Sequence, residues 1–295
     1  MRKSSPSLFK KLCKGINDEG ARVIDIGLCT TPMLNFTVAK YDFDCGIMIS
    51  ASHNPKEYNA FKLIGKNAVQ LRKGNGIDDI QEIIEKNDFE MLDEDENIEH
   101  NNILPDYIEH VMANYSEKRK LKIVVDYGNG VGSISGRPFF DRTSHEVIHM
   151  YEEPDGDYPN HQANPLEDEN LKDLIAKVKE VKADIGFAFD GDADRALAID
   201  GDGGIIMPDL MLALLAEEEI KEGGKGKVYY DLRFSKIVEE KVRELGGEPV
   251  MMRVGNPFYK EKLINEGGLI AGELSGHIMF GKNFGIDDGL FAVIK

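Results

Sequence analysis

Three carboxylates alternate along Asp190-Gly191-Asp192-Ala193-Asp194-Arg195, directly after the apolar run at 185–189. Carboxylate oxygens in this arrangement suit a hard cation such as Mg²⁺. An EF-hand is excluded, because its sixth and twelfth positions need Gly and Glu where this chain has Arg195 and Gly201. Acidic residues of a surface turn are the alternative, but open α/β sheets gather ligands at the carboxyl ends of their strands. We therefore favour a metal site, with Arg195 beside it able to bind a phosphate.

A second polar loop, Ser50-Ala51-Ser52-His53-Asn54-Pro55, follows the apolar run at 45–49, and Lys62 stands ten residues beyond Ser52. An isolated serine most often caps the next element, whereas a serine with cations nearby can carry a phosphoryl group. The sequence has no GxSxG elbow, so a serine hydrolase is not favoured. Neighbouring side chains diverge in an extended chain, so we do not expect His53 to be the base for Ser52.

A third loop, Gly272-Glu273-Leu274-Ser275-Gly276-His277, follows the apolar run at 269–271. Glu273, Ser275 and His277 offer donors and acceptors of the kind that read vicinal sugar hydroxyls. The alternative is an ordinary connection from strand to turn, with Glu273 exposed.

Alternating periodicities predict the elements that position these loops. Helices are expected at 7–17, 31–40, 77–87, from about 106, and at 170–182, 210–221, 235–245 and 257–266. Strands are expected at 22–26, 45–49, 61–64, 122–126, 185–189, 227–231, 249–253 and 269–271, with two more flanking the turn at 200–204. This pattern predicts three consecutive, similar α/β domains with mixed, mainly parallel sheets, at residues 1–98, 99–204 and 205–295. The acidic stretch 93–99 is interpreted as the linker at the first boundary.

The composition restricts the partners. Among 295 residues, 36 Lys and Arg against 53 Asp and Glu give a net charge of −17, which argues against nucleic acid and anionic lipid as partners. An anionic ligand then needs a local cluster of cations. The sequence has neither a long apolar run nor a leader-like N-terminus, and its three cysteines form no CxxC pair, so we expect a cytoplasmic protein with reduced cysteines in packing positions.

Together and in this order, the three loops resemble the active-site set of the α-D-phosphohexomutases, most closely the bacterial phosphomannomutase/phosphoglucomutase group. The resemblance continues through 153–156, 159–161, 170–174 and 284–289, so it covers nearly the whole chain. It implies that hexose 1-phosphate and hexose 6-phosphate are interconverted through a phosphoserine and a hexose 1,6-bisphosphate, with Mg²⁺ as cofactor and a phosphosugar as the small-molecule partner.

The resemblance also implies a role for each matching residue. Ser52 matches the phosphoserine, and Asp190, Asp192 and Asp194 match the magnesium ligands, whose fourth ligand is usually a phosphoserine oxygen. Lys62 and Arg195 match catalytic residues beside the reacting hydroxyl, with Lys62 a candidate for proton transfer. The residues expected to bind substrate are His53, Arg253, Glu273, Ser275 and His277.

The sequence departs from the family pattern in three respects. It begins within the family's first domain and ends within the third, so both are expected to be incomplete, and the fourth domain is expected to be absent. We therefore expect poor activity from this chain alone. Asn256 stands where bacterial relatives often have His, and an amide cannot titrate, which puts an acid/base role there in doubt. A non-catalytic phosphosugar-binding module and a Mg²⁺-dependent phosphatase remain as alternatives, and the sequence gives no oligomeric state.

Overall fold

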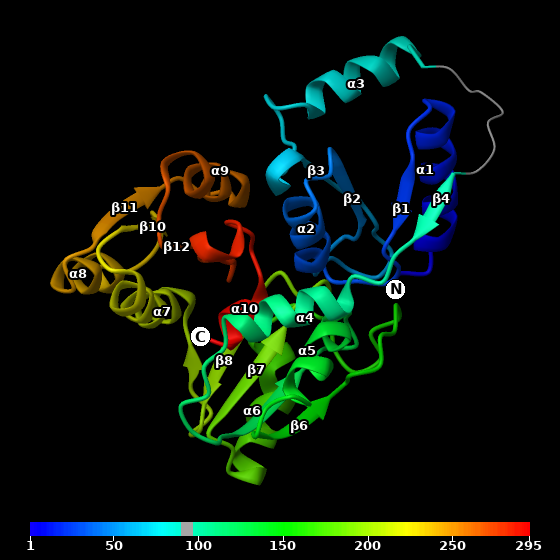
Figure 1. Ribbon diagram of the computed structural model, residues 1–295. Helices are drawn as coiled ribbons and strands as arrows, with labels where there is room; N and C mark the ends of the chain where they lie inside the picture. Colours follow the sequence, from blue (N-terminus) through cyan, green and yellow to red (C-terminus); the bar gives the residue numbers. More distant parts are fainter. Residues whose placement is uncertain (90–96) are drawn as a thin grey trace.

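The structure is a computed structural model that describes residues 1–89 and 97–295, and its helices and strands form three consecutive groups (Figure 1). The first group contains two small sheets. Strand β1 (Val23–Asp25) pairs in parallel with β4 (Ile98–His100), and β2 (Cys45–Ile49) pairs antiparallel with β3 (Phe61–Gly65). Its helices are α1 (Ser5–Asp18), α2 (Thr31–Lys40) and α3 (Ile77–Lys86), with a 3-10 turn at Lys66–Ala68.

The second group is built on a five-stranded sheet in the order β6-β5-β7-β8-β9. Strands β6, β5 and β7 run parallel, and β8 and β9 continue the sheet antiparallel. The strands are β5 (Lys122–Asp126), β6 (Glu146–Met150), β7 (Ile185–Phe189), β8 (Ala196–Asp200) and β9 (Ile205–Ile206). The helices are α4 (Leu104–Ala113), α5 (Gly132–Phe140) and α6 (Lys172–Val181), the last preceded by a 3-10 turn at Asp168–Leu171.

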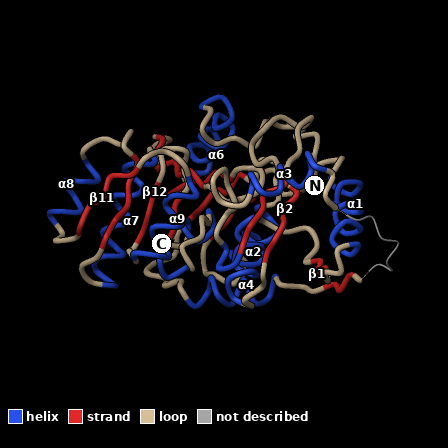
Figure 2. Tube along the Cα trace, turned by 90° about the horizontal axis from the view of Figure 1, so that it is seen from above, coloured by secondary structure: helices blue, strands red, loops and turns tan. Residues whose placement is uncertain are grey.

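The third group has a four-stranded sheet in the order β11-β10-β12-β13, of which only the β12–β13 pair is antiparallel. Its strands are β10 (Lys227–Asp231), β11 (Glu248–Met252), β12 (Ile270–Gly272) and β13 (Ile278–Phe280). Its helices are α7 (Pro208–Gly223), α8 (Ile237–Glu244), α9 (Asn256–Glu266) and α10 (Gly289–Val293), with a 3-10 turn at Gly281–Asn283. Figure 2 shows α8 and β11 at one end of the molecule and α1 and β1 at the other.

Local chemistry explains where the elements near the functional loops begin. Thr30 caps α2 by accepting a hydrogen bond from Met33 N at 3.2 Å, and Pro32 occupies the first turn, where a missing N–H costs nothing. Asp288 caps the short helix α10 in the same way, through Phe291 N at 3.0 Å. Both caps lie in segments that contact the loop after β7, so the fold fixes these contacts through the backbone.

The central sheet is buried on both faces, which explains why its strands read as continuous apolar runs. In β5, Ile123 and Val125 belong to the largest core cluster, while Val124 points to the other face and packs with Leu174 and Val178 of α6. The largest cluster also contains Phe36 of α2 and Phe291 of α10, so one continuous core connects the three groups. Among the described residues, no helix has the length and apolar character needed to cross a membrane.

The α/β architecture and most of the predicted elements are confirmed, but α5, β6, β13 and α10 were missed. The sequence of α5 includes two glycines and Pro138, a composition that argues against a helix. Packing decides instead: a Cβ on Gly136 would lie 2.8 Å from the Tyr127 ring, so glycine lets α5 approach the sheet.

Three further expectations need correction or lie outside the description. Ile98 and Glu99 were assigned to a linker, yet they belong to β4, because their backbone pairs with β1; residues 93–96 of that linker lie outside the described residues. Cys13 and Cys29 are buried as expected, but Cys45 is exposed at the start of the short sheet β2–β3 and is not a packing residue.

Candidate active site

The loops that follow β2 and β7 meet face to face. Ser52 Oγ donates a hydrogen bond to Asp190 Oδ2 at 2.8 Å, although the two residues are 138 positions apart in the sequence. The backbones are also in close contact, since a Cβ on Gly191 would lie 2.6 Å from the carbonyl oxygen of Ser52. The structure therefore joins the serine loop and the carboxylate loop in one site.

Ser52 has an unusual backbone that changes the geometry of its neighbour. Its φ of +50° lies in the left-handed region, which costs free energy for a serine and is typical of functional loops. With this turn, Ser52 Oγ lies 3.2 Å from His53 Nδ1, so the expectation that the two side chains diverge is wrong. The divergence rule holds only for extended backbone.

Arg195 determines the state of His53. Its NH2 donates to Ser52 Oγ at 2.8 Å and also contacts His53 Nδ1. A guanidinium has only donors, so Nδ1 accepts and the ring proton belongs on Nε2. Burial, reinforced by the Arg195 charge, lowers the pKa of His53 to about 4. His53 is thus a neutral ring whose Nδ1 lone pair is already engaged by Arg195.

The three carboxylates form a buried cluster. Asp190, Asp192 and Asp194 are 0%, 1% and 2% exposed, which rules out a surface turn, and one ligand oxygen from each lies within 4.8 Å of the others. Asp192 Oδ1 and Asp194 Oδ1 are buried without a hydrogen-bond partner in the structure. Buried oxygens of this kind, in an all-carboxylate set, fit a divalent cation such as Mg²⁺. Burial, together with the neighbouring carboxylates Asp194 and Asp192, raises the pKa of Asp190 despite the opposing charge of Arg195.

A cation from another element lies against the cluster and offsets part of its negative charge. Lys62 Nζ of β3 lies 2.6 Å from Asp192 Oδ2 and 2.6 Å from Asp194 Oδ2. Burial works against the charged form of Lys62, but these carboxylates outweigh it and raise its pKa, so the side chain is an ammonium. Asp192 Oδ2 also accepts from Thr31 Oγ1 at 2.6 Å and Ser50 Oγ at 2.9 Å.

The third loop, residues 272–277, also contacts the carboxylate loop. Arg195 and His277 form an antiparallel backbone bridge, and His277 Nδ1 lies 3.0 Å from Asp287 Oδ2 and 3.9 Å from Asp194 Oδ1. Burial opposes the protonated form of His277, but Asp194 and Asp287 outweigh it and raise its pKa. Ser275 Oγ is buried without a hydrogen-bond partner in the structure. An unpartnered buried hydroxyl in this loop is suited to a polar ligand.

Glu273 and Asn256 occupy fixed positions next to this loop. Glu273 is 4% exposed, so the alternative of an exposed turn residue does not hold. Its Oε1 accepts from Gly255 N at 3.0 Å and lies 3.7 Å from Arg233 NH2, an ion-pair distance. Asn256 Nδ2 donates to Asp287 Oδ2 at 2.6 Å, the oxygen that also pairs with His277 Nδ1 at 3.0 Å, so the amide helps to hold His277 through Asp287.

Arg253 is placed apart from the cluster, at an exposed position. Its guanidinium lies 4.2 Å from the centre of the Phe258 ring, and Arg72 of the first group lies 4.8 Å from the same ring. Arg72 NH2 also pairs with Glu261 at 2.8 Å, so two elements far apart in the sequence meet at this point. The structure does not bring Arg253 to Ser52.

Sequence reasoning missed several residues of the site. Asp287 lies in the segment 284–289 and could have been found from it, but Thr31 and Lys260 carry no motif. Lys260 of α9 is only 2% exposed. Burial lowers its pKa to about 8, despite the opposing effect of Asp287 and Asp194. Such a group is revealed only by packing.

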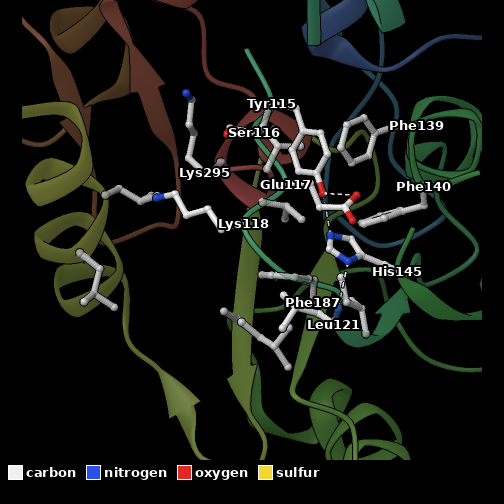
Figure 3. Close-up of a pocket in the computed structure, with 18 of the residues that line it drawn as sticks. Tyr115, Ser116, Glu117, Lys118, Leu121, Phe139, Phe140, His145, Phe187 and Lys295 are labelled. Atoms are coloured by element: carbon white, nitrogen blue, oxygen red, sulfur yellow. Dashed lines mark hydrogen bonds between the residues drawn. The ribbon is translucent and has the colours of Figure 1, made fainter. Parts of the chain in front are cut away.

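Two cavities have different relations to the site. One of about 920 Å³ reaches Ser52 and Asp192 and continues between α1, β1 and β2. The other, of about 380 Å³, lies beside the opposite ends of β5 and β7 (Figure 3). There His145 Nε2 lies 2.8 Å from Tyr115 Oη, whose hydroxyl donates to Glu117 at 3.3 Å, and Lys118 and Lys295 also line this cavity among apolar side chains (Figure 3). No predicted site residue lines this second cavity.

Comparison with known proteins agrees with this site. Family models described as phosphoglucomutase/phosphomannomutase, alpha/beta/alpha domains I, II and III, match residues 1–91, 105–203 and 207–295. The chain is 38% identical over 293 residues to a phosphoglucomutase of Neisseria gonorrhoeae, covering 99% of this chain and 63% of the relative. It is 37% identical over 295 residues to a phosphomannomutase/phosphoglucomutase of Pseudomonas aeruginosa, covering 100% of this chain and 63% of the relative.

A solved structure shows the same similarity. The crystal structure of a phosphoglucomutase/phosphomannomutase family protein from Burkholderia thailandensis superposes with a TM-score of 0.89 at 35% identity, over 98% of this chain and 64% of that one. The chain thus spans a little under two thirds of the length of these relatives. With domains I to III matched in order, it belongs to the phosphoglucomutase/phosphomannomutase family of α-D-phosphohexomutases.

Proposed function

We propose that this chain carries the phosphoryl-transfer site of a phosphohexomutase that interconverts hexose 1-phosphate and hexose 6-phosphate. The supporting observation is the position of Ser52 Oγ, 2.8 Å from Asp190 Oδ2 and 2.8 Å from Arg195 NH2. A hydroxyl between a carboxylate cluster and a guanidinium is placed to hold a phosphoryl group, because Arg195 on one side and a metal ion held by the carboxylates on the other would offset its charge.

In the proposed reaction, the bond between phosphorus and Ser52 Oγ breaks as a bond forms to the free hydroxyl of the hexose phosphate. Lys62, held as an ammonium by Asp192 and Asp194, returns a proton to Ser52 Oγ and then takes the proton of the sugar hydroxyl. Arg195 stabilises the negative charge on the transferring group. Asp190, Asp192 and Asp194 would hold Mg²⁺, which supplies further positive charge to the phosphoryl oxygens. The hexose 1,6-bisphosphate then presents its other phosphate to Ser52.

The third loop is proposed to orient the sugar. Ser275 Oγ has no partner in the structure, and Glu273 is fixed by Gly255 N, so both can contact vicinal hydroxyls. His277, whose pKa is raised by Asp194 and Asp287 against the effect of burial, is proposed to contact the substrate from the same loop. His53, beside Ser52, and Arg253, at an exposed position over the Phe258 ring, complete the proposed substrate contacts.

Intact-mass spectrometry tests this proposal. The wild-type chain is incubated with glucose 1,6-bisphosphate and Mg²⁺, and we expect one phosphoryl group on Ser52. Ser52→Ala should abolish it, and Ser7→Ala, at an exposed serine of α1, should not. An unmodified wild-type chain would contradict the proposal.

The same samples separate the alternatives. Conversion of glucose 1-phosphate to glucose 6-phosphate is expected for a mutase. Release of inorganic phosphate without conversion would indicate the Mg²⁺-dependent phosphatase instead. Retention of glucose 1,6-bisphosphate without any modification of Ser52 would indicate a binding module.

A further inference from the structure

Arg2, which the proposed chemistry does not use, makes an unusual set of contacts. It is only 3% exposed although it lies near the chain's first residue. Its NH1 donates to the carbonyl oxygens of Pro55 and Tyr58, both at 2.7 Å. Its NH2 donates to those of Ser52 at 2.9 Å and Asn54 at 2.7 Å. All four terminal N–H groups of one guanidinium are therefore bound to one loop.

Apart from Arg2, that loop is held by its own turns and by the Ser52 side chain, which is hydrogen-bonded to Asp190 and Arg195. Residues 54–58 are exposed and form no helix or strand, and such segments open readily when few contacts hold them. One further carbonyl, that of His53, accepts from Gln162 Nε2 at 2.5 Å. Arg2 is thus the main anchor for the backbone that gives Ser52 its positive φ.

The charge of Arg2 also needs explanation. Within residues 1–89 and 97–295, no carboxylate lies within ion-pair distance of its guanidinium, which stacks near the Tyr158 ring at 5.7 Å. Buried charges are normally paired, and this chain carries an excess of acidic residues that could have supplied a partner. A phosphoryl group on the adjacent Ser52 would bring a charge of about −1.5 to −2 close to it.

We propose that Arg2 is a positioning residue for Ser52. It holds the loop so that Ser52 Oγ faces Asp190 and Arg195, and its positive charge favours the phosphorylated form of Ser52. The effect of the Arg2 charge on phosphorylated Ser52 rests on the proposed function, whereas the positioning of the loop does not.

The test compares Arg2→Lys and Arg2→Ala with Lys3→Ala. Lys3 is a matched control, because it is the adjacent cation but has a 75% exposed side chain that pairs with Asp157 at the surface. The first measurement is amide hydrogen exchange, which needs no phosphoryl transfer. We expect exchange over residues 52–58 to rise at least about tenfold in both Arg2 variants, with β5 and β7 unchanged as evidence of folding.

The second measurement is the rate at which Ser52 gains a phosphoryl group from glucose 1,6-bisphosphate and Mg²⁺. Misplacing a reacting group by about 1 Å can cost about 100-fold, so we expect a loss of that size in both Arg2 variants and none in Lys3→Ala. Lysine fails because one ammonium cannot reach four carbonyls. Added guanidinium should restore part of the rate of Arg2→Ala, and methylammonium at the same concentration should not.

The outcomes are distinct. Wild-type exchange over 52–58 in Arg2→Lys would overturn the positioning role. Increased exchange without a slower phosphorylation rate would overturn the link to Ser52. If wild-type Ser52 gains no phosphoryl group, the proposed function fails and the link fails with it, while the exchange data still decide whether Arg2 fixes the loop.

Discussion

Lys62 Nζ lies 2.6 Å from Asp194 Oδ2, so a lysine from the antiparallel strand pair of the first domain neutralises a carboxylate in the loop after β7. The same ammonium lies 2.6 Å from Asp192 Oδ2. A metal ion drawn to these carboxylates would therefore meet a protein cation already bound to two of their oxygens. Cation binding and the position of Lys62 should be coupled.

The first prediction concerns this competition. Lys62→Met removes the charge but keeps an unbranched side chain, so we expect Mn²⁺, as a probe for Mg²⁺, to bind about tenfold more tightly by calorimetry. Lys66→Met is the control, because Lys66 is 58% exposed and pairs with Asp42 at 3.6 Å. Weaker Mn²⁺ binding in Lys62→Met would show that the lysine supports the site instead of competing for it.

The second prediction tests the carboxylates themselves. Asp192 Oδ2 accepts from Thr31, Ser50 and Lys62, while its Oδ1 has no partner in the structure. Asp192→Asn keeps the shape but replaces one acceptor with a donor, so Mn²⁺ affinity should fall at least about tenfold. Asp202→Asn, at an exposed turn after β8, changes the net charge equally and should leave the affinity unchanged. Equal affinity in the two variants would remove the metal assignment.

The third prediction is that the pKa values of His53 and His277 are shifted in opposite directions from the usual value for histidine. Burial and the Arg195 charge lower the pKa of His53 to about 4, whereas Asp194 and Asp287 raise that of His277 against the effect of burial. NMR of ring-labelled protein should show that His53 is neutral at pH 5, with its proton on Nε2. His277 should keep its second ring proton to a higher pH than an unperturbed histidine does. A His53 midpoint near 6.5 would contradict the buried contact with Arg195.

The effect on stability follows from these directions. Between pH 6.5 and about 4 the unfolded chain protonates His53 while the folded chain does not, so the protein loses stability as the pH falls through this window. His277 acts oppositely: its contribution is complete below the unfolded pKa and is lost as the pH rises through the folded one. Because His53 is partly exposed, we expect its share to be about 1 kcal/mol, which His53→Gln should remove in urea unfolding at pH 5.

The fourth prediction is that Cys29 and Cys45 differ in their reactivity toward an alkylating reagent. Burial, with Asp25 nearby, raises the pKa of the Cys29 thiol to about 12, whereas Cys45 is exposed. Only a thiolate reacts quickly with iodoacetamide, so Cys45 should be modified first at pH 8 and Cys29 should be protected until the protein unfolds. Peptide mapping of the native protein, with Cys45→Ser as control, checks the order. Early labelling of Cys29 would show that the first domain opens readily.

Much of the site could be predicted because its residues form short motifs at the ends of apolar strands. The runs before Ser50, Asp190 and Glu273 are β2, β7 and β12, and each polar loop begins where its strand ends. The three strands lie in different sheets, but ligands gather beyond the carboxyl ends of strands in α/β folds, so the place of each loop directly after its strand is informative. Segments with weak intrinsic preference could not be predicted, as the Gly-containing and Pro-containing α5 shows.

Conformation and long-range contact could not be predicted from the same residues. The position of His53 depends on the positive φ of Ser52, and the residue types in this loop do not predict that backbone conformation. Lys260 and Arg2 look like ordinary surface cations in the sequence, and only packing buries them to 2% and 3% exposure. A charged side chain can be buried only where other groups compensate its charge or accept its hydrogen bonds, and here those groups lie far away along the chain.

The fifth prediction concerns a buried bond between the second and third domains. Tyr107 of α4 donates to Asp288, the cap of α10, with distances of 2.8 and 2.9 Å to its two oxygens. Both residues are 0% exposed, and burial raises the pKa of Asp288 to about 6 although hydrogen bonds from Phe291 N, Tyr107 and Asn283 oppose it. Tyr107→Phe leaves this carboxyl short of a donor, so the free energy of unfolding should fall by about 1–3 kcal/mol.

The pH dependence distinguishes this cause from a simple loss of packing. A pKa raised from 3.8 to about 6 means that the folded protein binds the proton more tightly, so Asp288 costs stability as the pH rises through that interval. Without the Tyr107 hydroxyl the ionised carboxylate is less well solvated, and the defect of Tyr107→Phe should be larger at pH 8 than at pH 5 in urea unfolding. Tyr41→Phe is the matched control, because Tyr41 makes a similar bond to Asp106 at the surface and should cost less than about 0.5 kcal/mol at either pH. An equal defect at both values would mean that Asp288 remains protonated throughout, and that the contact between the two domains depends on shape and not on charge.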